Sequence, residues 1–142
     1  MTGMTLIDLY NRAEAQGIEV DDVPMRALAS ASFPQNWIAM DSSKFETTAA
    51  EKVAIAHEIG HIETGGFYNI YSSYDLRSKH ETRADKQAIS MLIPLDDLFV
   101  ALHDGMTEPW QLAEHFDVPD TFVQKALDLY ADPLRKLTVK NQ

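Results

Sequence analysis

Apolar residues recur along this chain with two different spacings, which divide it into helices and a short region of strands. Over residues 5–15 they recur every three or four positions, as on an amphipathic helix, and Gly17 suits the end of that helix. Three later segments read as extended, and a turn signal at 34–36 separates the last two. These extended segments are 18–20, 25–33 and 37–40. The pattern predicts a small antiparallel sheet after the first helix.

The next apolar pattern is helical, with its apolar side running from Val53 to Ile62. Thr47 or Thr48 can cap its start, and Glu51 stands three residues beyond Thr48, as in a capping box. Gly65-Gly66 is expected to end it. The sequence therefore predicts a well-bounded helix in the middle of the chain.

A second strongly helical pattern covers residues 79–93 and is stopped by Pro94. A loop rich in Tyr and Ser, residues 67–79, separates it from the central helix and is long enough to border a cleft. Shorter helices are predicted over 96–103, from Thr107 or Glu108 up to a break at 116–119, and over 120–130.

The expected fold class is α+β, mostly helical, in a single domain over residues 1–142. Within it, residues 1–106 hold the sheet and the two long helices, and residues 107–131 form a C-terminal helical pair. Residues 132–142 are expected to be a loosely held tail.

Charge and composition narrow the possible partners. The net charge is −10, no basic stripe is evident, and the last basic residues gather near the C-terminus, so nucleic acid is a poor candidate. No apolar run approaches the length of a membrane span, and no secretion signal is evident. The absence of cysteine fits a cytoplasmic protein and limits any zinc site to His and carboxylate ligands, the set typical of catalytic sites.

One motif in the central helix carries recognisable chemistry: His57-Glu58-Ile59-Gly60-His61 has the form H-E-x-x-H. Residues four apart lie on one helix face, so His57 and His61 can bind one zinc ion. Glu58 is then placed to act as general base toward a water at the metal. The motif alone is also compatible with an ordinary polar helix face.

A third ligand is needed, and the extended metzincin pattern does not supply it because position 67 is Phe67. Glu81 on the second helix is the candidate, with Asp85 one turn later on the same face. Asp85 can accept the free N–H of a ligand imidazole, most plausibly that of His57. Gly60 and Ala84 are small enough to let the two helices approach closely.

Other residues compete for these roles. His80 adjoins Glu81 but points about a quarter-turn away on a helix, and Asp75 lies in the predicted loop. His103 and His115 lie in other helices and read as ordinary surface or half-buried histidines. Three tyrosines and His80 are alternatives for a donor that stabilises an oxyanion, and the sequence does not choose among them. These tyrosines are Tyr68, Tyr71 and Tyr74.

The chain resembles the ImmA/IrrE-type zinc metallopeptidases, small proteins common on phages and mobile elements. The resemblance rests on four stretches: A-I-A-H-E-I-G-H at 54–61, E-T-R-A-D at 81–85, A-I-S-M-L-I-P at 88–94 and L-A-E-H-F-D-V-P at 112–119. One departure is Gln87, which stands where the family run usually has Phe.

The resemblance implies a role for each matching residue. His57, His61 and Glu81 would be the zinc ligands, Glu58 the catalytic base, and Asp85 the residue that orients a ligand histidine. It also implies a zincin-like α/β peptidase core with more helix than strand. The resemblance also implies a protein or peptide substrate of the kind that better-known members cut, a helix-turn-helix repressor whose cleavage releases gene expression.

Metal-assisted peptide hydrolysis is therefore the expected activity, with the strand at 37–40 offering an edge to an extended peptide. One rival is a zinc-containing binding or sensing module with little proteolysis. Another is a DNA-binding regulator, since the break at 116–119 lies between two helices as in a helix-turn-helix. DNA binding is the weaker of these two alternatives, because residues 108–130 contain several acidic residues and a single lysine, Lys125.

Overall fold

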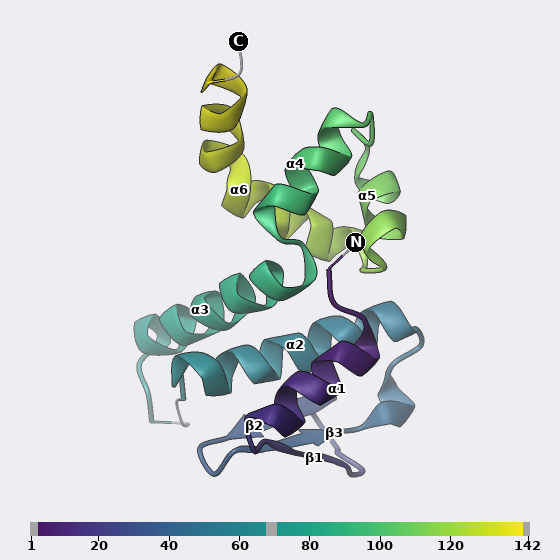
Figure 1. The fold of residues 1–142 in the computed structure, drawn as a ribbon. Helices are drawn as coiled ribbons and strands as arrows, with labels where there is room; N and C mark the ends of the chain where they lie inside the picture. Colours follow the sequence, from purple (N-terminus) through teal and green to yellow (C-terminus); the bar gives the residue numbers. More distant parts are fainter. Residues whose placement is uncertain (1–2, 68–70, 141–142) are drawn as a thin grey trace.

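The computed structural model describes residues 3–67 and 71–140, with side chains described through residue 136. The fold is α+β: a first helix and a small sheet precede five further helices (Figure 1). The elements are α1 (Leu6–Ala15), β1 (Glu19–Asp22), β2 (Ser30–Phe33), β3 (Trp37–Met40), a 3-10 turn (Ser42–Lys44), α2 (Thr48–Thr64), α3 (Tyr74–Leu92), α4 (Leu95–His103), α5 (Pro109–Phe116) and α6 (Asp120–Lys140).

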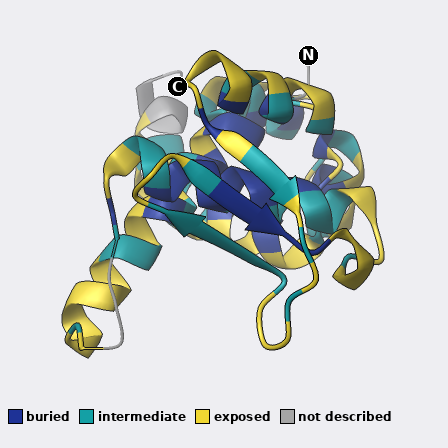
Figure 2. Cartoon of the chain, turned by 90° about the horizontal axis from the view of Figure 1, so that it is seen from below, coloured by how far each residue is buried: buried dark blue, intermediate teal, exposed yellow. Residues whose placement is uncertain are grey.

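The sheet is mixed rather than antiparallel, which corrects the prediction. Its strand order is β1-β3-β2, with β3 parallel to β1 and antiparallel to β2. The tight turn at 34–36 makes the β2–β3 hairpin, as expected, and Asn36 there adopts the left-handed conformation with φ of 58°. The segment after β1 leaves a space beside β1, and β2 forms on the far side of that space. β3 then lies between β1 and β2 and is the most buried strand (Figure 2).

Only the end of the predicted 25–33 strand is a strand. Backbone carbonyls of Met25, Arg26 and Leu28 all accept hydrogen bonds from the Lys44 ammonium, and Asp41 accepts from the Met25 N–H at 2.9 Å. These groups are thereby used by side chains instead of a strand partner, which holds the segment as a loop.

Two helices are longer than predicted. α3 begins at Tyr74 because the Ser73 side chain caps it, accepting from the Leu76 N–H at 3.1 Å. α6 continues to Lys140 rather than ending near residue 130, with Pro133 inside it. Leu134 packs against the core, which favours continuation past the missing N–H of proline. The tail predicted over 132–142 is therefore helical as far as Lys140.

A single cluster of buried apolar side chains joins the helices to the sheet. It includes Leu9 of α1, Ile38 of β3, Ile59 of α2, Leu92 of α3 and Phe116 of α5. α2 lies between the sheet and α3 and contacts both, so it is the central element of the fold (Figure 1). No helix within the described ranges combines the length and the apolar character that a membrane span needs.

Candidate metal centre

The motif helix α2 has firmly defined ends. Thr47 is its cap, with the side chain accepting from the Ala50 N–H at 3.1 Å, and Gly65 ends it in the left-handed conformation with φ of 69°. These ends fix which residues face α3 and the sheet. The motif lies in the last two turns, where His57 and His61 share one face.

The contact between α2 and α3 is as close as the small residues predicted. A Cβ added to Gly60 would lie 2.7 Å from the carbonyl oxygen of Ala84, well inside normal contact. Gly60 is therefore required for the approach of the two backbones, and this approach brings Glu81 of α3 to the histidines of α2.

Three side chains meet at this helix contact. Glu81 Oε2 lies 2.7 Å from His57 Nε2, and Glu81 Oε1 lies 3.2 Å from His61 Nε2. Each residue offers one possible ligand atom, and these atoms lie within 4.8 Å of one another. The predicted third candidate is thus brought to the histidine pair across two helices.

Hydrogen bonds on the far side of each ring set the tautomers. His61 Nδ1 lies 2.7 Å from the Gly66 carbonyl oxygen, which can only accept, so this nitrogen carries the proton. His57 Nδ1 lies 2.8 Å from Asp85 Oδ1, where an ionised carboxylate likewise accepts. In their neutral forms both rings therefore present an Nε2 lone pair toward Glu81.

This arrangement is unfavourable without a cation. Two Nε2 lone pairs face the two oxygens of one carboxylate, so acceptors face acceptors at hydrogen-bond distance. Either extra protons on the rings or a bound metal ion between them relieves the conflict. The donor set of two imidazoles and a carboxylate fits zinc, which takes three protein ligands and keeps one open position in catalytic sites.

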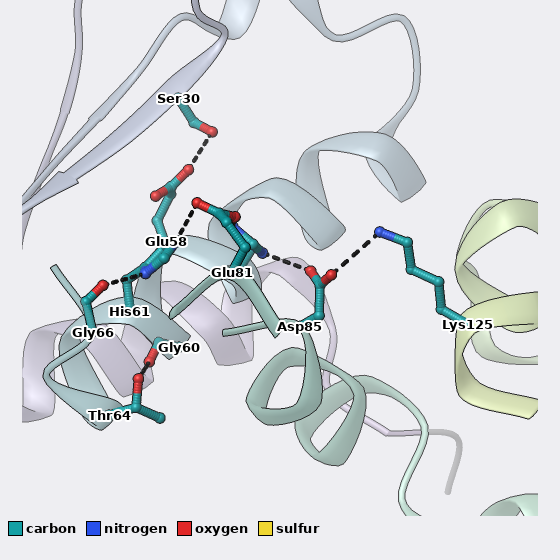
Figure 3. A network of polar contacts seen from close by, with 10 residues as sticks. Ser30, Glu58, Gly60, His61, Thr64, Gly66, Glu81, Asp85 and Lys125 are labelled. Atoms are coloured by element: carbon teal, nitrogen blue, oxygen red, sulfur yellow. Dashed lines mark hydrogen bonds and ion pairs between the residues drawn. The ribbon is translucent and has the colours of Figure 1, made fainter. Parts of the chain in front are cut away.

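Glu58 points elsewhere, toward the sheet. Its side chain is buried, with 7% of the residue exposed, and its Oε2 accepts a hydrogen bond from the Ser30 hydroxyl of β2 at 2.7 Å (Figure 3). Glu58, the histidines and Glu81 line one cavity of about 370 Å³, together with residues of β2. Glu58 therefore borders the same open space as the possible ligands without being one of them.

The carboxylates around His57 affect its charge. Burial lowers the pKa of His57, but its hydrogen bond to the Asp85 carboxylate and the nearby charges of Glu58 and Glu81 outweigh it, so the net pKa is raised. Burial raises the pKa of Asp85. Its hydrogen bond with His57 and the nearby charge of Lys125 together outweigh burial, so the net pKa of Asp85 is lowered. Lys125 of α6 lies 3.4 Å from Asp85 Oδ2, as Figure 3 shows. A chain of polar contacts therefore runs from His57 through Asp85 to the C-terminal helix.

Gln87, the departure from the family pattern, has a polar role. Its amide donates to Glu63 Oε1 at 2.6 Å, and Arg12 of α1 and Gln16 directly after α1 donate to the same carboxylate. Burial raises the pKa of Glu63, but the hydrogen bonds from these three side chains and the charge of Arg12 outweigh it and bring the pKa to about 2. Gln87 therefore helps to join α1, α2 and α3 through one carboxylate and leaves the candidate ligands in place.

The competing residues do not join this cluster. Asp75 lines a different groove on the outer face of α3, beside Lys79, Arg83 and Lys86, three basic residues on one face that were not grouped from the sequence. His103 stacks on Phe99, and His115 packs edge-on against Phe116.

The oxyanion donor is still not identified. Tyr71 and Tyr74 are 88% and 77% exposed and are not among the residues that line the cavity. His80 is likewise not among the lining residues, and Tyr68 lies outside the described residues.

Three contacts of the site were not predicted. They involve the Ser30 hydroxyl, the Gly66 carbonyl and the Lys125 ammonium. Each depends on the packing of segments far apart in sequence or on a local turn, and no motif marks it. The sequence signal was confined to the two helices that hold the possible ligands.

Comparisons of the chain with models of protein families and with curated proteins find no match. The resemblance to ImmA/IrrE-type peptidases accordingly rests on the quoted residues alone and stays a prediction.

Proposed function

We propose that this protein is a zinc-dependent endopeptidase whose ligands are His57, His61 and Glu81. The observation that carries the proposal is the meeting of both Nε2 lone pairs with the Glu81 carboxylate, a geometry that a cation stabilises. A cysteine-free site with two His and one Glu has the ligand set of catalytic rather than structural zinc.

Zinc bound there would supply a Lewis acid that activates water and polarises a peptide carbonyl. Glu58 would supply the proton transfers: its carboxylate would take a proton from the attacking water and give it to the leaving amine. Asp85 and the Gly66 carbonyl would hold the two imidazoles in the tautomer that a metal requires.

The peptide-binding edge needs a correction. β3 was expected to offer an edge to substrate, but it is the central strand and pairs on both sides. β2 is an edge strand, and its residues Ser30, Ala31 and Ser32 line the cavity with Glu58. An extended peptide added alongside β2 would pass the possible ligands, so we place substrate there.

The proposed substrate is a protein, and a helix-turn-helix repressor remains a proposal from the resemblance alone. A zinc-containing binding or sensing module is the rival, because the same ligands can hold a metal without catalysis. A substitution of Glu58 distinguishes the peptidase from the binding module, because Glu58 lines the cavity but does not belong to the group that could hold the metal.

The test is Glu58→Gln, which keeps the size of the side chain and removes the base. We expect a peptidase to lose at least about 100-fold in turnover, the scale of general-base catalysis, while zinc content per chain stays the same. Hydrolysis of a peptide library by the zinc-loaded protein, read by mass spectrometry, measures the first, and elemental analysis measures the second. Equal cleavage by both proteins would contradict the proposal.

A further inference from the structure

Ser30 is the hydrogen-bond partner that the described part of the chain provides for the buried Glu58 carboxylate. The Ser30 Oγ to Glu58 Oε2 distance is 2.7 Å, typical of a strong hydroxyl to carboxylate bond. A carboxylate with only 7% of its residue exposed needs such a donor, because burial without one is costly. The contact joins edge strand β2 to the motif helix across 28 positions of sequence.

The hydrogen bond also restricts how the carboxylate turns. The last torsion of a glutamate side chain has broad minima, so an unbound carboxylate rotates easily. With Oε2 held by Ser30, the plane of the group is fixed, and Oε1 has no hydrogen-bond partner among the described residues. One oxygen is thus anchored, and Glu58 lines the cavity shared with His57 and His61.

β2 carries a second serine on the same face as Ser30, but of these two described residues only Ser30 bonds to Glu58. Side chains two apart in a strand lie on the same face, so Ser32 shares the face of Ser30 and also lines the cavity. No hydrogen bond joins Ser32 to Glu58 among the described contacts. β2 therefore supplies both a candidate positioning residue and a closely matched neighbour without that contact.

We propose that Ser30 is a positioning residue that holds Glu58 in the orientation its proton transfers require, an inference that rests on the proposed function. Ser30 does not itself exchange protons with substrate in this account. Its hydroxyl fixes one oxygen of Glu58 so that the other is presented to the cavity. The same strand that would align a peptide thereby also orients the base.

The experiment measures binding of acetohydroxamate to the zinc-loaded protein by calorimetry, which needs no turnover. A hydroxamic acid gives up a proton when it binds zinc, and a neighbouring carboxylate base accepts it, so its affinity reports the placement of Glu58. The variants are Ser30→Ala, Ser30→Thr and the control Ser32→Ala, each also combined with Glu58→Gln. Zinc content is measured first in every protein.

We expect Ser30→Ala to weaken acetohydroxamate binding about tenfold, the scale of one hydrogen bond to a charged group. Ser30→Thr keeps the hydroxyl and should restore binding to within about threefold. Any effect of Ser32→Ala should persist unchanged in the Glu58→Gln background, because Ser32 lines the cavity without a hydrogen bond to Glu58. In the Glu58→Gln background Ser30→Ala should have no further effect, because the two changes act through one contact.

The inference is overturned if Ser30→Ala binds acetohydroxamate like wild type, or if its effect persists unchanged without the Glu58 carboxylate. It is equally overturned if the effect of Ser32→Ala also disappears in the Glu58→Gln background, since that indicates a general change in the strand and not a specific Ser30 contact. Wild-type protein that takes up no zinc would instead refute the proposed function. A peptidase assay that fails while the Ser30–Glu58 coupling is found would refute proteolysis and leave the positioning role intact.

Discussion

Two pairs of helices in this protein each carry a sequence pattern that suggests a function, and the contacts within each pair differ. α2 and α3 bring polar residues into contact across a close backbone approach, with Glu81 between two histidines. α5 and α6 form a helix, break, helix unit that resembles a DNA-binding motif. Their contact is apolar, with Phe116, Val123 and Ala126 buried, while Glu114 and Asp120 are exposed.

The arrangement of two helices alone is therefore a poor guide to their function. The break between α5 and α6 is made by Asp117 in the left-handed conformation, and the Phe116 carbonyl there accepts from the buried Lys52 ammonium of α2 at 2.9 Å. The unit is thus anchored to the core and offers acidic side chains to solvent. Such a surface is unsuited to phosphate contacts.

Adding a side chain at the close contact between α2 and α3 should have the largest effect. Gly60→Ala places a methyl group 2.7 Å from the Ala84 carbonyl, so α2 and α3 must separate. We expect zinc affinity to fall more than about 100-fold and the free energy of unfolding to fall by about 1–3 kcal/mol, measured by chelator competition and urea denaturation. Gly105→Ala is the control, since Gly105 has φ of 97° and no close neighbour for a Cβ. It should lose stability but not zinc affinity.

A smaller loss is expected when the imidazole partner is neutralised. Asp85→Asn removes the charge that accepts from His57 Nδ1 at 2.8 Å, which leaves the ring orientation and tautomer less well fixed. Zinc affinity measured by chelator competition should fall about tenfold, at the lower end for such partners because the amide oxygen can still accept. An unchanged affinity would show that Asp85 does not orient the ligand.

The C-terminal pair should respond in stability and not in metal binding. Lys52→Met leaves the Phe116 carbonyl without its buried donor, and we expect a loss of about 1–2 kcal/mol in urea denaturation with zinc affinity within about twofold of wild type. Burial lowers the pKa of Lys52 below its ordinary 10.5, and the Asp117 charge only partly offsets this. The unfolded chain therefore binds this proton more tightly, so wild-type stability gains as pH rises toward 10.5 and the variant lacks that gain. A large loss of zinc affinity in Lys52→Met would contradict the distinction between a metal-binding pair, α2 and α3, and a structural pair, α5 and α6.

The parts of the fold that were predictable from sequence depend on local spacing. The ends of α2, the shared face of His57 and His61, and the close approach at Gly60 each follow from residues near one another in sequence or from side-chain size. The placement of Glu81 needed one assumption, that its helix packs on α2, and the structure confirms it.

The rest depends on contacts that no local pattern encodes. The parallel pairing of β1 with β3 joins segments separated by another strand, so the sequence favoured a simple meander. The polar first turns of α3 hide its start because no apolar stripe marks them. Ser30 was missed for the same reason, since only the packing of β2 on α2 gives its hydroxyl a partner.

The most direct test of the account is metal content per chain in wild type and in Glu81→Ala, purified without chelators or a metal-binding tag. We predict about one zinc per wild-type chain and a sharp reduction in a variant that remains folded by circular dichroism. Wild-type protein that holds no metal even after zinc is added back would contradict the account, as would equal zinc in both proteins.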